Sequence, residues 1–205
     1  MKSVHPKVSA AFRLKQGTHS LRRILHVIDI SHTDGALPSI AVRALPAGSM
    51  IGAIYTYSHL TPIAVQVAQP CDAHEFSFVH EIGHILDHHS LNLHSGFATK
   101  AADLNDLRYW KHAVMSTSEI RSLQQLQGGP TALASAFNLL DIREIWARTY
   151  VQWIAQRSKD AKLNSELRRR AASPNFLTRL SQWEAGHFAA ISREIDVLFQ
   201  RRGWI

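Results

Sequence analysis

The feature that most constrains this chain is the pentad HEIGH at positions 80–84. On an α-helix its spacing places the imidazoles of His80 and His84 one turn apart, with the carboxylate of Glu81 beside the first. The chain has thirteen histidines among 205 residues, and on the order of 0.03 copies of such a pattern are expected by chance. The pentad therefore predicts a helix and indicates a metal site, zinc in particular.

The length and composition are those of an ordinary folded protein. A chain of 205 residues, of which 45% are hydrophobic, is long enough for one substantial core and short for two independent ones. We expect a single domain over residues 1–205, with a sheet part at about 21–70 and a helical part at about 72–205.

Cysteine usage and the N-terminal segment bear on the compartment. Cys71 is the only cysteine, so no intramolecular disulfide is expected. The first residues contain no apolar core typical of a signal peptide, and no stretch reaches eighteen apolar residues. These patterns predict a cytoplasmic protein without a membrane-spanning segment.

The net charge of +7 comes from scattered residues and from two basic runs, Arg168–Arg170 and Arg201–Arg202. No aromatic residues interleave with the first run, so we interpret it as a solvated helical face. Nucleic-acid binding through this basic C-terminal part is the less favoured alternative.

Between residues 21 and 68, short apolar runs rich in β-branched residues alternate with turn residues. This pattern is typical of strands. The predicted strands cover residues 24–30, 40–45, 50–57 and 63–68. They predict a small, mostly antiparallel, four-stranded sheet.

The pattern becomes helical from Asp72, where Asp72 and Glu75 form a variant of the capping box. At 100° per residue, His80, Gly83, His84 and Asp87 share one side of this helix, and the apolar residues share the other. The apolar side is expected to pack, leaving the histidine side free for chemistry.

Three further helices are predicted. A second capping box, Ser116 to Glu119, precedes one that Gly128–Pro130 ends. An apolar helix runs from about residue 131 or 138 to 155, and the last one from about 175 to 199. The predicted fold class is α+β, with the sheet first and the helices after it.

A catalytic zinc ion usually has three protein ligands, so a third donor is needed. The candidates are His88, His89, His94, Asp103, Asp106, Glu119, Asp141 and Glu144. Glu144 is favoured because the helical wheel places it among Leu140, Ala147 and Val151. A carboxylate in an apolar stripe is costly to bury unless it is paired or bound to a metal.

Other interpretations of these residues stay open. Glu144 would alternatively form an ion pair with Arg148 one turn later, and Glu119 is explained by its capping box. Asp87 and Asp141 would either orient the ligands or lie on helix surfaces. The neighbouring residues His88 and His89 are expected at the surface, near the end of their helix.

These residues resemble the zincin metallopeptidases of the gluzincin branch, in which HExxH on one helix is completed by a glutamate on a later helix. The match lies in the pentad and in Glu144, within the pattern E-x-x-A-R-x-Y. The order of sheet and helices agrees over about residues 21–155. The segments around Glu144 and at the C-terminus are also loosely similar to phage-associated or mobile-element zincin-like proteins.

The resemblance implies that His80, His84 and Glu144 bind Zn²⁺ and that Glu81 is the general base. It also implies that the strand at 63–68 is an edge strand that pairs with an extended peptide. Asp87 and Ser90 stand where the metzincin pattern requires glycine and histidine, so that branch is excluded.

The implied reaction is peptide-bond hydrolysis, with a protein or peptide as substrate. The donors considered for the developing oxyanion are Tyr109, His112, Tyr150 and His187. Residues 91–115 are expected to form either a flap beside the site or an ordinary connection. The alternatives to a zinc endopeptidase are a catalytically silent zincin fold with a binding or phage-structural role, and a nucleic-acid-associated protein.

Overall fold

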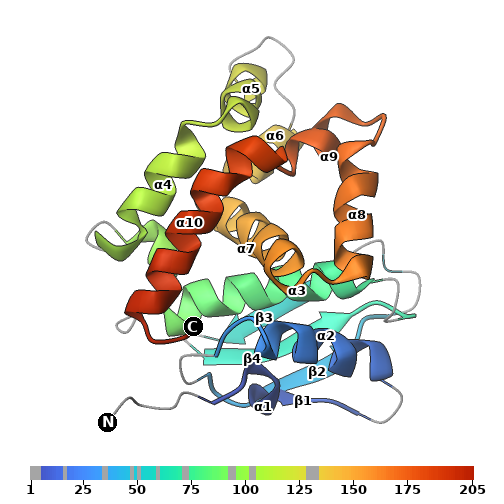
Figure 1. The fold of residues 1–205 in the computed structure, drawn as a ribbon. Coiled ribbons are helices and arrows are strands. Elements are labelled where there is room, and N and C mark those ends of the chain that lie inside the picture. The colour runs from blue at the N-terminus through green and yellow to red at the C-terminus, as the bar shows by residue number, and fades with distance from the viewer. Residues whose placement is uncertain are drawn as a thin grey trace.

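The fold is seen in a computed structural model of the chain (Figure 1). It describes residues 6–15, 18–33, 37–46, 49, 52–58, 61–70, 74–91, 96–101, 105–127 and 134–205. The predicted α+β class is confirmed, because a small sheet near the N-terminus is followed by helices. Among the described residues, no helix is both long and apolar enough to cross a membrane.

The sheet has four strands in the order β1-β2-β4-β3. The N-terminal elements are α1 (Val8–Ala11), β1 (Phe12–Arg13), α2 (His19–Asp29), β2 (Ile40–Ala44), β3 (Ala53–Ser58) and β4 (Thr61–Val67). The pairs β1-β2 and β2-β4 are parallel, and β3-β4 is antiparallel. The prediction of a mostly antiparallel sheet is wrong, because α2 connects β1 to β2 as a crossover.

The predicted strand at residues 24–30 is also wrong, because this segment belongs to α2. The buried residues Leu21, Ile24, Leu25 and Ile28 follow the helical spacing i, i+3, i+4, i+7. Its β-branched composition is typical of a strand, but the periodicity over the longer segment is helical. The missing fourth strand is β1, which is only two residues long.

The strand before the pentad helix is not an edge strand. β4 lies between β2 and β3, so the predicted edge at residues 63–68 is inside the sheet. The edge on this side is β3. The N–H of Ala68 donates to the carbonyl of Gly52, so the alternation of an antiparallel ladder directs the backbone groups of Ala53 and Tyr55 away from β4.

The helical part begins with α3, which lies between the sheet and the later helices (Figure 1). Its elements are α3 (Glu75–Ile85), the π-helical turn η2 (Leu86–Ser90), the 3-10 turns η3 (Ala98–Lys100) and η4 (Asn105–Leu107), α4 (Arg108–Met115), α5 (Ser118–Gln127), α6 (Ala134–Leu140), α7 (Ile142–Ser158), α8 (Ala161–Ala171), α9 (Phe176–Leu180) and α10 (Ala185–Arg201).

Two of the predicted helices are interrupted. The one ending near residue 155 divides at Asp141, whose carboxylate accepts the N–H of Arg143 and caps α7. The one predicted at 175–199 divides into α9 and α10. α8 is an additional helix that carries the arginine run.

The predicted caps differ from those observed. Asp72 lies outside the described residues, and α3 begins at Glu75. At α5, Thr117 rather than Ser116 accepts the N–H of Ile120, so the predicted capping box is wrong. Glu119 instead accepts the N–H of Glu184 at the start of α10.

The core is centred on α7, in which every residue from Ile145 to Ala155 is buried. A helix that is apolar on most sides is expected in the interior. Trp146, Tyr150 and Trp153 contribute large buried side chains on this helix. Because α7 packs directly against α3, its first turn lies beside the pentad.

Candidate metal centre

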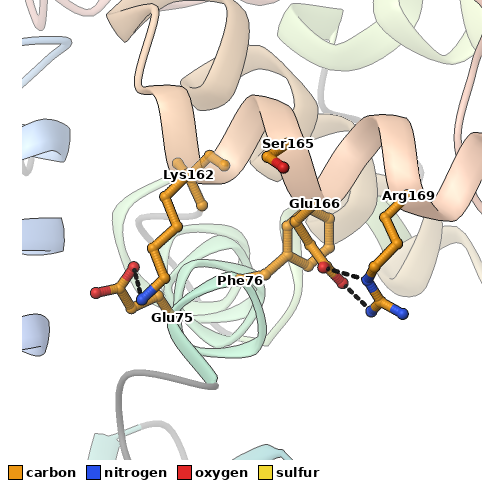
Figure 2. Close-up of a pocket in the computed structure, with 7 residues that line it drawn as sticks. Glu75, Phe76, Lys162, Ser165, Glu166 and Arg169 are labelled. Carbon is orange, nitrogen blue, oxygen red and sulfur yellow. Dashed lines mark hydrogen bonds and ion pairs between the residues drawn. The ribbon is translucent and has the colours of Figure 1, made fainter.

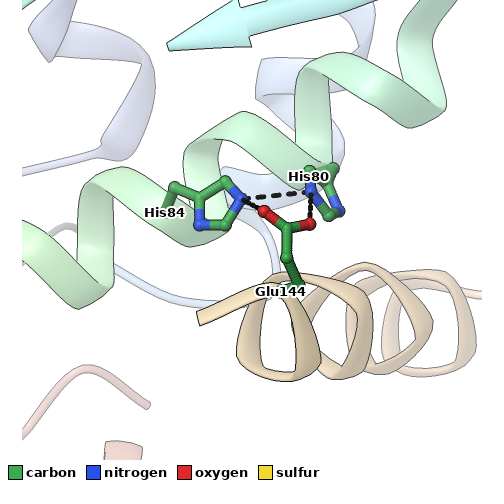
Figure 3. Close-up of side chains that lie close together, drawn as sticks. All are labelled: His80, His84 and Glu144. Atoms are coloured by element: carbon green, nitrogen blue, oxygen red, sulfur yellow. Dashed lines mark hydrogen bonds and ion pairs between the residues drawn. The ribbon is translucent and has the colours of Figure 1, made fainter. Parts of the chain in front are cut away.

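The structure brings the side chains of His80, His84 and Glu144 together between α3 and α7 (Figure 3). The Nε2 atoms of the two imidazoles are 3.1 Å apart. One carboxylate oxygen of Glu144 lies 3.2 Å from Nε2 of His80, and the other lies 3.2 Å from Nε2 of His84. Among the described residues, this is the group of three donors close enough to share one ion.

The donor set fits zinc in chemistry and in spacing. Two imidazoles and a carboxylate are common zinc ligands, and ligands at about 2.0–2.1 Å in tetrahedral geometry are separated by about 3.3 Å. The observed separations of 3.1 and 3.2 Å lie close to this value. A fourth position would remain for water or substrate.

A glycine allows the two helices to come this close. A Cβ atom at position 83 would lie 3.0 Å from Cα of Ala147 and 3.1 Å from Cδ1 of Tyr150. The Nε1 group of Trp146 donates to the carbonyl of Gly83 at 2.9 Å. α7 therefore packs against the histidine side of α3 at Gly83, a contact that the helical wheel did not predict, while His80 and His84 beside it line cavities.

The cap at Asp141 places Glu144 in the first turn of α7. The N-terminus of a helix favours negative charge, and the carboxylate is directed back toward α3. The alternative ion pair with Arg148 is not formed, since the Nε–H of Arg148 donates to the backbone carbonyl of Glu144. Among the described residues, the ion-pair partners of the Glu144 carboxylate are His80 and His84.

The electrostatics of the three donors favour a charged carboxylate. Burial alone would raise the pKa of Glu144, but the hydrogen bonds with His80 and His84 outweigh it and hold the pKa well below its usual range. Burial lowers the pKa of His80, whereas the interactions with Glu144 outweigh burial and raise the pKa of His84. An ionised carboxylate and neutral imidazoles are the forms that bind a metal.

Glu81 lies on the opposite edge of the pentad, toward the sheet. Its Oε2 atom accepts the backbone N–H of Tyr55 in β3 at 2.8 Å. Burial raises the pKa of Glu81 to about 7, against the opposing effects of His84 and this hydrogen bond. β3 thus orients the carboxylate of Glu81 through Oε2, and Oε1 takes no part in this hydrogen bond.

Two cavities meet at His80, Glu81 and Glu144. The first, of about 310 Å³, is also lined by His84, Ile54, Tyr55, Tyr57, Phe97 and Arg143. The second, of about 280 Å³, is also lined by Gly52, Ala53, Phe76, Ser77, Leu139, Arg148, Arg170, Ser181 and Gln182. The candidate ligands therefore lie at the centre of an extended groove.

The residues near the end of the pentad helix have structural roles. Asp87 is fully buried, and its carboxylate accepts the N–H and the Oγ1–H of Thr99. His88 is also buried, with Nδ1 2.8 Å from the Tyr55 hydroxyl oxygen. The expectation of surface residues is wrong for both. His89 is half-buried.

The other ligand candidates lie elsewhere or have other partners. Glu119 forms an ion pair with His187 at 3.0 Å, Asp106 with Arg202 at 2.9 Å, and Asp141 with Arg143 at 2.6 Å. His94 and Asp103 lie outside the described residues, as does Cys71.

None of the four predicted oxyanion donors lines either groove cavity. The hydroxyl of Tyr150 lies 2.7 Å from Nε2 of His32 in the core. Tyr109 and His112 belong to α4, and His187 pairs with Glu119. Tyr57 and Arg143 carry donors in the larger cavity, and sequence reasoning missed both because nothing local connects them to the pentad.

The described part of residues 91–115 contains η3, η4 and α4. The bond from the N–H of Thr99 to Asp87 anchors η3 to the end of the pentad helix. Phe97, just before η3, stacks on the His88 ring with centroids 4.7 Å apart. This segment therefore supplies a wall of the larger cavity.

A separate cavity of about 260 Å³ lies between α3 and α8 (Figure 2). Glu75 pairs there with Lys162, and Glu166 pairs with Arg169. Arg170 also pairs with Glu166, so Arg169 and Arg170 share one carboxylate and the run keeps a net positive charge.

Comparisons of the chain with protein-family models, with curated proteins and with solved structures find no match. The functional argument therefore depends on the geometry of the site.

Proposed function

We propose that this protein is a zinc-dependent metallopeptidase of zincin type. The observation that carries the proposal is the convergence of His80, His84 and Glu144 from two helices, at separations that suit one zinc ion. Glu81 adds a buried carboxylate at the same groove. A structural zinc site would not require this second carboxylate.

The groove and the edge strand suit a peptide substrate. β3 is the edge of the sheet, and its outward backbone groups at Ala53 and the carbonyl of Tyr55 lie along the two cavities, while the Tyr55 N–H donates to Glu81. An extended peptide can add to such an edge by backbone hydrogen bonds, and antiparallel pairs are slightly the more stable. Its reacting carbonyl would then lie beside the three donors.

Glu81 would accept a proton from the attacking water and return it to the leaving amine. A pKa near 7 suits both directions of transfer, and the Tyr55 N–H holds the carboxylate in place. A zinc ion bound by the three donors would supply Lewis acidity, which activates water near neutral pH and polarises the carbonyl.

The test compares wild-type protein with Glu81→Gln, using Glu184→Gln, which changes an exposed acid, as the matched control. Zinc content is measured by mass spectrometry, and activity by cleavage of labelled casein. We expect one zinc in all three proteins and a loss of activity of about 10²- to 10⁴-fold in Glu81→Gln alone.

A wild-type protein that binds no zinc would show that the ligand set is wrong. Equal activity in Glu81→Gln and wild type would remove Glu81 from the mechanism. One bound zinc without cleavage of any tested substrate would instead favour the catalytically silent alternative.

A further inference from the structure

The smaller groove cavity contains a buried cation without an anion. Arg148 is 4% exposed, and among the described residues no carboxylate forms an ion pair with it. Its guanidinium group donates to the backbone carbonyls of Glu144, Leu139 and Leu180, and it lies 5.2 Å from the Trp183 ring centroid. A guanidinium has five N–H groups, so these bonds leave donors for another partner.

The nearby charges do not neutralise Arg148. Its one favourable charge interaction is with Glu144, whose carboxylate is already held by the two histidines. A guanidinium group stays charged at neutral pH. A divalent cation bound at the three donors would add further positive charge to this end of the groove.

Gln182, which lines the same cavity, has a side-chain acceptor without a partner among the described residues. The Oε1 atom of Gln182 is buried and accepts no hydrogen bond from the described residues. Buried polar atoms are nearly always hydrogen-bonded. Gln182 lies in the sequence between Leu180 and Trp183, both of which contact Arg148, and both Gln182 and Arg148 line this cavity.

An occupant that satisfies both groups has an anionic oxygen pair close to an N–H donor. A carboxylate matches the planar guanidinium group, and a peptide N–H next to it would reach Gln182. The terminal residue of a peptide has this combination. A peptide running antiparallel to β3 would also direct its C-terminal side toward Ala53 and this cavity.

We propose that this cavity is a subsite for a peptide carboxylate, bound by Arg148 and supported by Gln182. The subsite rests on the proposed peptidase function, and it would select substrates with a free C-terminus or an acidic side chain on that side of the reacting bond. Arg170 lines the same cavity but shares the carboxylate of Glu166 with Arg169, whereas no described carboxylate pairs with Arg148, so we assign the selection to Arg148.

Calorimetric binding of three probes tests this subsite in zinc-loaded Glu81→Gln protein, in which cleavage is prevented. The probes are N-acetyl-tetraalanine as the free acid, the same peptide as its amide, and an amide with glutamate at the third position. We expect the free acid to bind at least tenfold tighter than the amide. The glutamate probe binding tighter than both would identify a side-chain carboxylate as the ligand and would also support the subsite.

Variants separate binding by Arg148 from binding by zinc. Arg148→Gln is expected to abolish the preference for carboxylate while retaining zinc, and Arg168→Gln, which removes an equal charge at an exposed position, is expected to keep it. Equal binding of all three probes to the parent protein would overturn the proposal. So would an unchanged preference in a folded Arg148→Gln protein.

If Arg148→Gln does not fold, the variant Gln182→Glu tests the carboxylate subsite. This change places a carboxylate inside the cavity, so we expect it to remove the preference and to raise the melting temperature at pH 7. A preference that survives in Gln182→Glu would overturn the proposal.

Zinc content and casein cleavage, measured on wild-type protein, keep the two proposals distinguishable. A protein that binds zinc and cleaves casein without preferring carboxylates contradicts only the subsite. A protein that prefers the acid probe but cleaves nothing contradicts only the peptidase function.

Discussion

Two buried charges on neighbouring helices, Glu75 and Arg148, have opposite environments. The Glu75 side chain is 3% exposed and pairs with Arg23 at 2.6 Å and with Lys162 at 3.1 Å. Arg148 is equally buried, but its partners in the described part of the chain are backbone carbonyl oxygens and an aromatic ring. Removing a charge from water is costly unless a partner compensates for it.

The comparison distinguishes a buried charge that is paired within the protein from charges for which we propose a ligand. The Glu75 cluster is balanced by the chain itself and joins α2, α3 and α8. Glu144 is held by two histidines whose donor atoms all face one point, and Arg148 lacks an anion. The incomplete charges both lie at the groove, which is where we propose metal and substrate to bind.

The largest effect is expected for Glu144→Ala, which removes a candidate ligand. Loss of residues that only orient zinc ligands already costs about 10- to 100-fold in affinity, so we expect a fall of at least ~100-fold and loss of cleavage. Competition with a fluorescent zinc chelator measures the affinity.

Glu119→Ala is the control for this prediction, because Glu119 is a buried acid with its partners at the start of α10. Equal losses of zinc affinity in the two variants would contradict the assignment of Glu144.

Gly83→Ala tests whether the approach of α7 to α3 holds the donors together. The added Cβ meets backbone at 3.0 Å, and such overpacking costs about 1–3 kcal/mol, which outweighs the gain of about 1 kcal/mol in helix propensity. We expect lower stability in urea unfolding and weaker zinc binding.

Gly186→Ala in α10 is the matched variant, since nothing lies within 4 Å of its Cβ position. It should be neutral or stabilising, with unchanged zinc binding. Unaltered zinc affinity in Gly83→Ala would show that the close packing is not needed by the site.

Glu75→Gln is expected to change stability alone. Its partners Arg23 and Lys162 are 40% and 51% exposed, so they can be solvated after the change, and the loss should be about 1 kcal/mol. Urea unfolding measures this loss. Zinc affinity reduced as much as in Glu144→Ala would remove the distinction between the two clusters.

The smallest effect concerns pH and the Glu119–His187 pair. Burial would raise the pKa of Glu119, but hydrogen bonds from His187 and the Glu184 backbone lower it from 4.5, and Glu119 raises the pKa of His187 from 6.5. The lowered pKa of Glu119 stabilises the folded state above about pH 4.5, and the raised pKa of His187 stabilises it below about pH 6.5.

The free energy of unfolding of wild type should therefore exceed that of Glu119→Gln most between pH 4.5 and 6.5. Urea titrations at pH 3, 5.5 and 8 measure the difference. A difference that is constant across these three values would contradict this pairing in solution.

Local patterns predicted the elements that carry the site. The HEIGH spacing predicts a helix. The presence of Glu144 within an apolar stripe of its helix indicates a carboxylate that needs a partner. The α+β order was also readable from strand-like and helical segments. These inferences depend on neighbours within one or two turns, which a sequence displays directly.

The remainder depends on contacts between distant segments. The segment of α2 has the β-branched composition of a strand, and only its helical periodicity over a longer stretch distinguishes it from one. The role of Gly83 depends on Ala147, and the cavity of Arg148 depends on Gln182 in the connection after α9. Neither pairing has a signature in the order of residues, so only the fold reveals them.

The bond between Tyr55 and Glu81 separates two tasks within one pentad. The three candidate metal donors are brought together by the contact of α3 with α7, whereas the carboxylate of Glu81 is oriented by the sheet. Under the proposed mechanism, a displacement of β3 would impair proton transfer while leaving all three donors in position. Different neighbours of α3 would then govern catalysis and metal binding.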